Sequence, residues 1–103
     1  MEFKWSKAEK KIAKQAFDLA YDKKCQKIIE QIKRRNLSTG EDIWKLGSYI
    51  HKQQKEIDSV FDYRYSQLIL VFSILIKKNL LSLQDLAGLN DEKLDTINKI
   101  LKL

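Results

Sequence analysis

The chain contains no proline, and only three glycines interrupt it, Gly40, Gly47 and Gly88. Proline and glycine are the residues that most weaken or end helices, and the stretches between these glycines are rich in Lys, Gln, Glu, Leu and Ile, which favour helices. With 44% hydrophobic and 33% charged residues, the chain has the composition of a folded globular protein. These features predict an all-α fold, and 103 residues suffice for one domain.

Two capping-box patterns predict where two long helices begin. Ser6 and Glu9 have the spacing of such a box, and Ser38 and Glu41 repeat it. The first helix is expected to run to about residue 35, and the second to end or bend between residues 58 and 63. Because the connection between them is short, the two helices should form a long antiparallel hairpin over about residues 6–61.

The remaining part, about residues 62–103, is predicted to form a small helical head. Residues 68–76 are apolar on every side, which is typical of a buried helix, and Asn79 suits its C-terminal end. Ser82 and Asn90 can cap two further helices over residues 83–87 and 91–101, with Gly88 in the turn between them. We therefore expect residues 1–103 to be a single domain made of a hairpin and a head.

The apolar positions of the first helix predict a homodimer. They recur in rows four residues apart, so the apolar face drifts around the helix. Two sets consequently lie on nearly opposite sides: Ile12, Ala16 and Ala20, and Cys25, Ile29 and Ile32. One neighbouring helix cannot cover both sets, so we expect one neighbour from the same chain and another from a partner subunit.

Residues with the chemistry of catalytic or metal sites are scarce. Cys25 and His51 are the only cysteine and histidine, and they are far apart in sequence. A structural metal site needs about four ligands, and phosphate loops need clustered glycines. The sequence therefore predicts no catalytic residues, no metal, no cofactor and no enzyme activity.

The net charge of +6 is unevenly distributed along the sequence. Residues 1–36 contain eleven Lys and Arg residues against five Asp and Glu, which fits an acidic protein or a nucleic acid. The cations of the first helix do not share one face, however, because Lys7, Lys11 and Lys14 lie opposite Lys23, Lys27 and Arg34. This arrangement favours a solvated surface over a groove-binding helix.

The chain is expected to be cytoplasmic. Its single cysteine cannot pair within the chain, so the fold needs no oxidising compartment. Its longest apolar run, residues 68–76, is far shorter than the roughly 20 residues of a membrane-spanning helix.

Trp44 lies outside the apolar stripe of the second helix. It shares a face with Ser48, His51 and Lys55, which follow it at intervals of four, seven and eleven residues. An exposed tryptophan is a common anchor in protein interfaces, while a packed one would join the core against a neighbouring subunit. Both interpretations place Trp44 at an interface.

Segments 43–46 (IWKL), 56–58 (EID), 61–64 (FDYR) and 68–72 (LILVF) resemble the fluorescence recovery protein family. The resemblance implies an all-helical dimer, formed through a long hairpin that carries a smaller head. It also implies regulators that bind the photoactivated orange carotenoid protein and promote its return to the resting form, without a cofactor. Binding the relaxing form better than the active form would produce this acceleration.

The resemblance also implies site residues. Trp44 matches the tryptophan of the family, and Ile43 matches an apolar residue of its dimer interface, while Gly47, Ser48 and Gln54 stand where the family has His, Asp and Arg. Leu70 stands where the head has an aromatic residue. We therefore expect the partner-binding residues to be Trp44, Gly47, Ser48, His51, Gln54 and Leu70, and the dimer interface to contain Ile43, Trp44 and Ile50.

The changed positions favour a divergent member of the family, from a host without the orange carotenoid protein, that binds another protein. Two alternatives stay open: a regulator of the orange carotenoid protein that tolerates the changes, and a small basic dimer that binds nucleic acid.

Overall fold

The structure is a computed structural model that describes residues 2–103. It contains the α-helices α1 (Lys7–Lys33), α2 (Gly40–Val60), α3 (Leu68–Lys77) and α4 (Asp91–Leu101), and a 3-10 turn, η1 (Leu83–Leu86). This part of the chain has no strand, and an isolated bridge joins Ala87 to Leu89. The predicted all-α fold is confirmed.

Side-chain caps fix the helix starts, with one difference from the prediction. At α1 the expected capping box is present, with Ser6 Oγ accepting from the Glu9 amide and Glu9 accepting from the Ser6 amide. At α2 the box is formed by Thr39 and Asp42, so the prediction of Ser38 and Glu41 was wrong by one residue. Asp42 also accepts a hydrogen bond from the Ser38 amide. The helix cap is therefore Thr39, one residue later than predicted.

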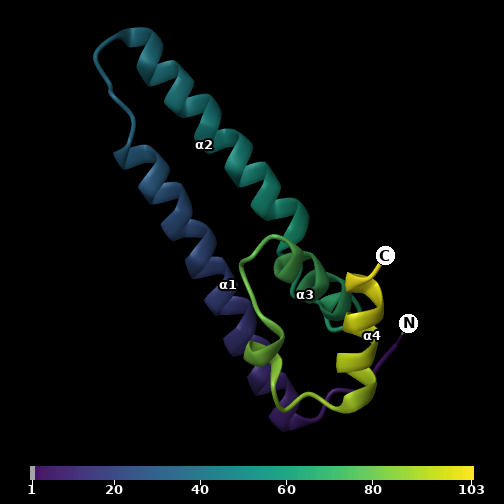
Figure 1. Ribbon diagram of the computed structural model, residues 1–103. Coiled ribbons are helices and arrows are strands. Elements are labelled where there is room, and N and C mark those ends of the chain that lie inside the picture. The colour runs from purple at the N-terminus through teal and green to yellow at the C-terminus, as the bar shows by residue number, and fades with distance from the viewer. Residues whose placement is uncertain (1) are drawn as a thin grey trace.

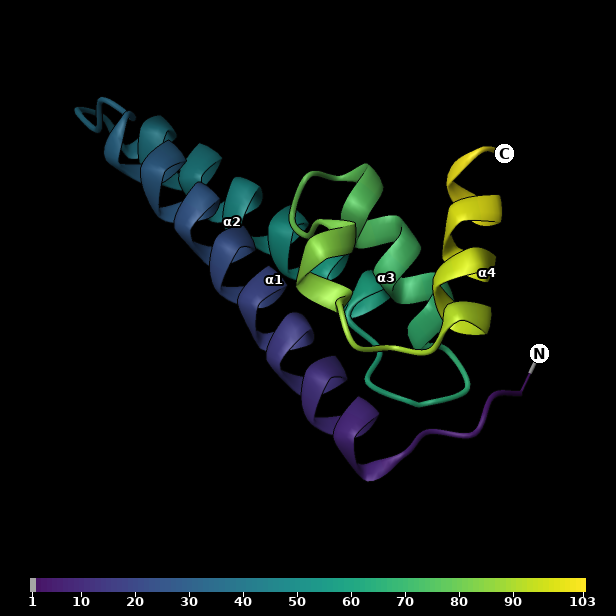
Figure 2. The same ribbon diagram turned by 60° about the horizontal axis from the view of Figure 1, so that its bottom comes forward.

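The molecule is elongated because the α1–α2 hairpin projects from a packed end (Figure 1). Its extents are 53 × 22 × 21 Å, and its radius of gyration is 16.5 Å. A compact chain of this length would have a radius of gyration of about 13 Å. Figure 2 shows α3, η1 and α4 gathered beside the first half of α1, with the hairpin tip far from both termini.

The hydrophobic core lies at the packed end. Three alanines of α1, Ala13, Ala16 and Ala20, are buried there, and their small side chains allow neighbouring elements to approach closely. α3 contributes half of the remaining core, packing against α1, α2 and α4. In contrast, α2 contains no buried residue, and neither does α1 beyond Ala20. The hairpin is therefore packed at one end only.

The prediction that α3 is buried on every side was wrong at Leu70. Leu68, Val71, Phe72 and Leu75 are buried, but the Leu70 side chain is 50% exposed. α3 lies at the edge of the packed end, so one row of its side chains faces outward. The helix ends at Lys77, close to the predicted end, and Asn79 two residues later adopts a positive φ of 60°.

An aromatic cluster joins the hairpin to the head. The Phe17 ring of α1 meets the rings of Phe61 and Tyr63 edge to face, at centroid distances of 5.4 and 4.9 Å. Burial and a hydrogen bond with Tyr65 raise the pKa of Tyr63 to about 12. Glu56 adds an ionic connection, because its carboxylate binds Lys24 of α1 and Lys78 after α3.

A buried ion pair fastens α4 to the start of α1. Lys93 is fully buried, and its Nζ lies 3.2 and 3.0 Å from the two oxygens of the Glu9 carboxylate. The same ammonium group donates to the Lys4 carbonyl at 2.6 Å and lies over the Trp5 ring at 4.9 Å. Lys93 therefore holds the N-terminal segment, α1 and α4 together.

Candidate functional site

Trp44 is the most exposed large side chain of the hairpin. It lies near the start of α2, close to the hairpin tip, and 76% of it is exposed. Ser48 and His51 are also exposed, and they follow Trp44 along the same face of the helix. Within the chain, Trp44 is therefore a surface residue.

The Thr39–Asp42 cap holds the helical turn that carries Trp44. The backbone amides of Ser38 and Thr39 both donate to the Asp42 carboxylate at 3.0 Å. These hydrogen bonds keep the pKa of Asp42 below its usual value. The start of α2 is thus fixed by local contacts, although no core packing supports it.

An adjacent face of α2 carries two of the three residues predicted for dimerisation, Ile43 and Ile50, whereas the third, Trp44, lies on the face described above. Ile43 is 55% exposed and Ile50 is 43% exposed. Helical spacing places Gly47 and Gln54 on this face rather than on the face of Trp44. The predicted partner-binding residues of α2 thus belong to two adjacent faces. Nothing lies within 4 Å of the position that a Gly47 side chain would occupy, so no helix of this chain approaches it.

A shallow groove lies between the two helices of the hairpin. Ile50, Gln54 and Ile57 line it from α2, Tyr21 and Ile28 line it from α1, and its volume is about 400 Å³. Ile50 and Gln54, which were assigned to different functions, therefore share one depression.

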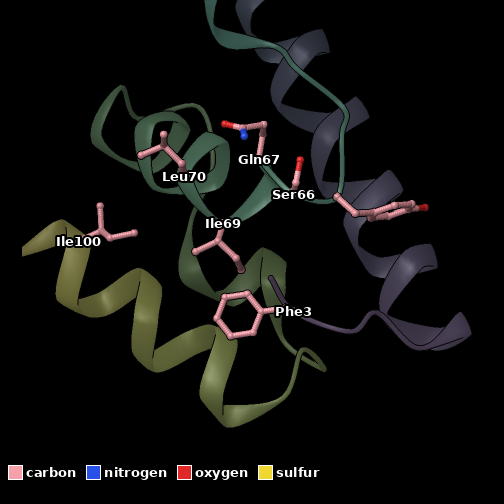
Figure 3. Close-up of a pocket in the computed structure, with 7 residues that line it drawn as sticks. Phe3, Ser66, Gln67, Ile69, Leu70 and Ile100 are labelled. Atoms are coloured by element: carbon pink, nitrogen blue, oxygen red, sulfur yellow. The ribbon is translucent and has the colours of Figure 1, made fainter. Parts of the chain in front are cut away.

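Leu70 borders a second, apolar pocket in the head (Figure 3). The pocket has a volume of about 260 Å³, and α3 and α4 contribute Ile69, Leu70 and Ile100 to its lining. Figure 3 shows Phe3, from the N-terminal segment, beside Ile69 at the base of the pocket. No sequence pattern indicates Phe3 or Ile100, because the lining comes from three separate parts of the chain.

The structure therefore places the predicted residues in two regions. Trp44, Gly47, Ser48, His51 and Gln54 lie on the hairpin, whereas Leu70 lies on the head. α2 begins at the hairpin tip and α3 belongs to the packed end, so the start of α2, which carries Trp44, is far from α3 (Figure 1). Gln54 lies nearer the packed end, two residues before Glu56, which pairs with Lys78.

Among residues 2–103, no three His, Cys, Asp or Glu side chains gather where they could hold a metal ion. His51 stands alone on the exposed face of α2, and Cys25 is a free, half-buried thiol. None of the helices in the described part of the chain is both long and apolar enough to cross a membrane.

Known proteins resemble the whole arrangement. A family model described as the photoprotection regulator fluorescence recovery protein matches residues 5–101. The fluorescence recovery protein of Synechocystis sp. is 29% identical over 101 residues, which cover 96% of this chain and 93% of that protein.

Two solved structures share both the hairpin and the head. The Fremyella diplosiphon fluorescence recovery protein has 35% identity and a TM-score of 0.89, over 97% of this chain and 100% of that one. The Synechocystis structure has 29% identity and a TM-score of 0.87 over the same shares.

Proposed function

Because the chain belongs to the fluorescence recovery protein family, we propose that it is a non-enzymatic regulator that binds another protein. We further propose that it works as a homodimer, assembled through the α1–α2 hairpin, and that it acts in the cytoplasm. The family is described as one of photoprotection regulators. Membership of a family of regulators supports a function that is carried out by binding another protein.

The observation that carries this proposal is that α2 has no buried residue over its 21 positions. Most helices in proteins are stabilised by packing an apolar face rather than by helix propensity. Ile43 and Ile50 are apolar, and they are 55% and 43% exposed. Each such side chain gains about 1.5 to 3 kcal/mol when it is fully buried. A second hairpin lying against α2 would supply the missing burial.

Two adjacent faces of α2 allow dimerisation and partner binding to coexist. We assign the face of Ile43, Gly47, Ile50 and Gln54 to the dimer, because it includes the groove between the helices. The face of Trp44 then stays available to the partner. Leu70 and its pocket would form a second contact on the head.

Oligomeric state tests the proposal directly. Light scattering coupled to size exclusion should find a dimer for the wild type and a monomer for Ile43→Glu, with helicity retained in circular dichroism. Asn98→Glu makes the same charge change on the exposed side of α4 and should leave the dimer intact. A wild-type monomer at micromolar concentration would contradict the proposal.

A second candidate is acceleration of the relaxation of the orange carotenoid protein. Trp44 favours it, since this tryptophan matches the one in the family and is exposed. Ser48 and Gln54 weaken it, because they replace charged residues, and losing one partner of a buried charge pair commonly costs about 2 to 5 kcal/mol.

The second candidate is tested by following dark recovery of the orange form after illumination, with and without this protein. Acceleration that Trp44→Ser abolishes would support it. An unchanged recovery rate in the presence of the intact dimer would assign the protein to a different partner.

A further inference from the structure

The positive charge of the molecule is concentrated in one region of the fold. We define the distal arm as residues 23–55, which comprise the second part of α1, the hairpin turn and most of α2. This arm contains nine Lys and Arg residues and three Asp and Glu, while the rest of the chain contains eleven of each. The whole net charge of +6 therefore belongs to the arm. Residues 1–36 of the sequence have an equal excess, because that range and the arm both contain the second part of α1.

Few of these cations are neutralised. Within residues 2–103, ion pairs reach only two of the nine: Lys45 lies 3.3 Å from Glu41, and Lys24 lies 3.4 Å from Glu56. The Asp42 carboxylate accepts hydrogen bonds from the amides of Ser38 and Thr39 at the start of α2 and, in the part of the chain that the structure describes, pairs with none of these cations. The exposed cations of the arm without an ion pair are Lys23, Lys27, Lys33, Arg34, Lys52 and Lys55.

Two of these lysines accompany Trp44. Lys55 lies about three turns along α2 on the same face, and Lys52 lies on the adjoining side. The partner-binding face of α2 thus combines one exposed aromatic ring with Lys55, and Lys52 lies beside it; within the described residues neither lysine has an ion pair. Pairing two hairpins in a dimer brings two such arms together and strengthens the positive field.

We infer that the partner of this protein presents an acidic protein surface with an apolar or aromatic side chain at its centre. This inference rests on the proposed function. Protein interfaces have an apolar centre and a polar rim, which matches Trp44 among lysines. Complementary charge would guide the encounter and exclude basic partners. A nucleic acid fits less well, because phosphates contact cations and offer nothing to the exposed ring of Trp44.

Binding of three fluorescent probes to the full chain tests this inference: poly-L-glutamate, a random copolymer of glutamate and tyrosine, and a 20-base-pair DNA duplex. Anisotropy at 50 mM KCl should show the copolymer binding at least threefold more tightly than polyglutamate. Trp44→Ser should remove that difference. Raising KCl to 300 mM should weaken both polypeptides more than tenfold, since salt screens exposed charges.

Two charge-matched variants locate the surface. Lys52→Glu/Lys55→Glu changes the arm, and Lys99→Glu/Lys102→Glu makes the same charge change in the head. We expect about tenfold weaker copolymer binding for the arm variant and a change of less than twofold for the head variant.

Three results would overturn the inference: duplex DNA binding more tightly than the copolymer, no binding of either polypeptide, or equal losses in the two variants. Light scattering on the same samples reports the dimer separately. Loss of the dimer would contradict the proposed function, whereas a stable dimer without polypeptide binding would contradict only the acidic partner.

Discussion

Replacing Lys93 with methionine should destabilise the fold more than its small change in size suggests. Methionine fills a similar volume, but it removes the ammonium group that lies 3.0 and 3.2 Å from the oxygens of Glu9. Glu9 is 7% exposed, so its carboxylate would stay buried with only the amides of Ser6 and Asn90 as partners. Breaking a buried pair in this way typically costs about 3 to 5 kcal/mol.

The pKa of Glu9 indicates a similar contribution of this carboxylate to the free energy of unfolding. Burial alone would raise this pKa, but hydrogen bonds from Asn90, Ser6 and Lys93 lower it from 4.5 to about 2. Such a decrease corresponds to at most about 3 kcal/mol of stability at neutral pH. Because the pKa is lower in the folded state, this stability is fully present above about pH 5 and disappears as the pH falls toward 2.

Urea unfolding followed by circular dichroism, at one protein concentration, measures both effects. Lys93→Met should lose about 3 to 5 kcal/mol, and the double variant Glu9→Gln/Lys93→Met should lose clearly less than the sum of the two single variants. Between pH 5 and 2, Glu9→Gln should lack part of the wild-type decrease. Lys99→Met, on an exposed position of α4, should change stability by less than about 0.5 kcal/mol. A loss below about 1 kcal/mol for Lys93→Met, or additive single variants, would refute this role of the pair.

Two further pairs of variants use the same unfolding assay. Gly88→Ala should destabilise by about 2 kcal/mol or more, because Gly88 has a φ of 106° and a new Cβ would lie 2.5 Å from Ile12 Cδ1. In the monomeric Ile43→Glu variant, Gly47→Ala should stabilise the hairpin by about 1 kcal/mol, since the position is helical and open within the chain; a smaller gain or a loss in the dimer would indicate that the partner hairpin approaches there. Phe72→Ala should cost about 3 to 5 kcal/mol, because Phe72 is fully buried. Leu70→Ala, two residues earlier, should cost about 1 kcal/mol or less, and a comparable loss in both variants would contradict the exposure of Leu70.

The candidate site was predictable where it depends on single helices. The spacing of Trp44, Ser48 and His51 predicts a shared face, and all three are exposed. Gln54, also predicted to bind the partner, lies ten residues after Trp44, and this spacing turns it toward Ile50 and the groove. The head pocket was not predictable, since it forms only when Phe3, Tyr65 and Ile100 come together from distant segments.

The helical class and the approximate positions of the helix starts follow from the sequence alone. Proline is absent, and caps such as Ser6 and Asn90 bind amides three residues away, so both signals can be read locally.

Only the tertiary structure decided which helical surfaces are buried. α1 has similar residues along its length, yet it is packed only where α3 and η1 fold back on it. Lysine is rarely buried, and Lys93 joins the core because Glu9 and the Lys4 carbonyl reach it across more than eighty residues of sequence. Burial depends on contacts between segments far apart in the chain, whereas capping and helix propensity depend on neighbours within a turn.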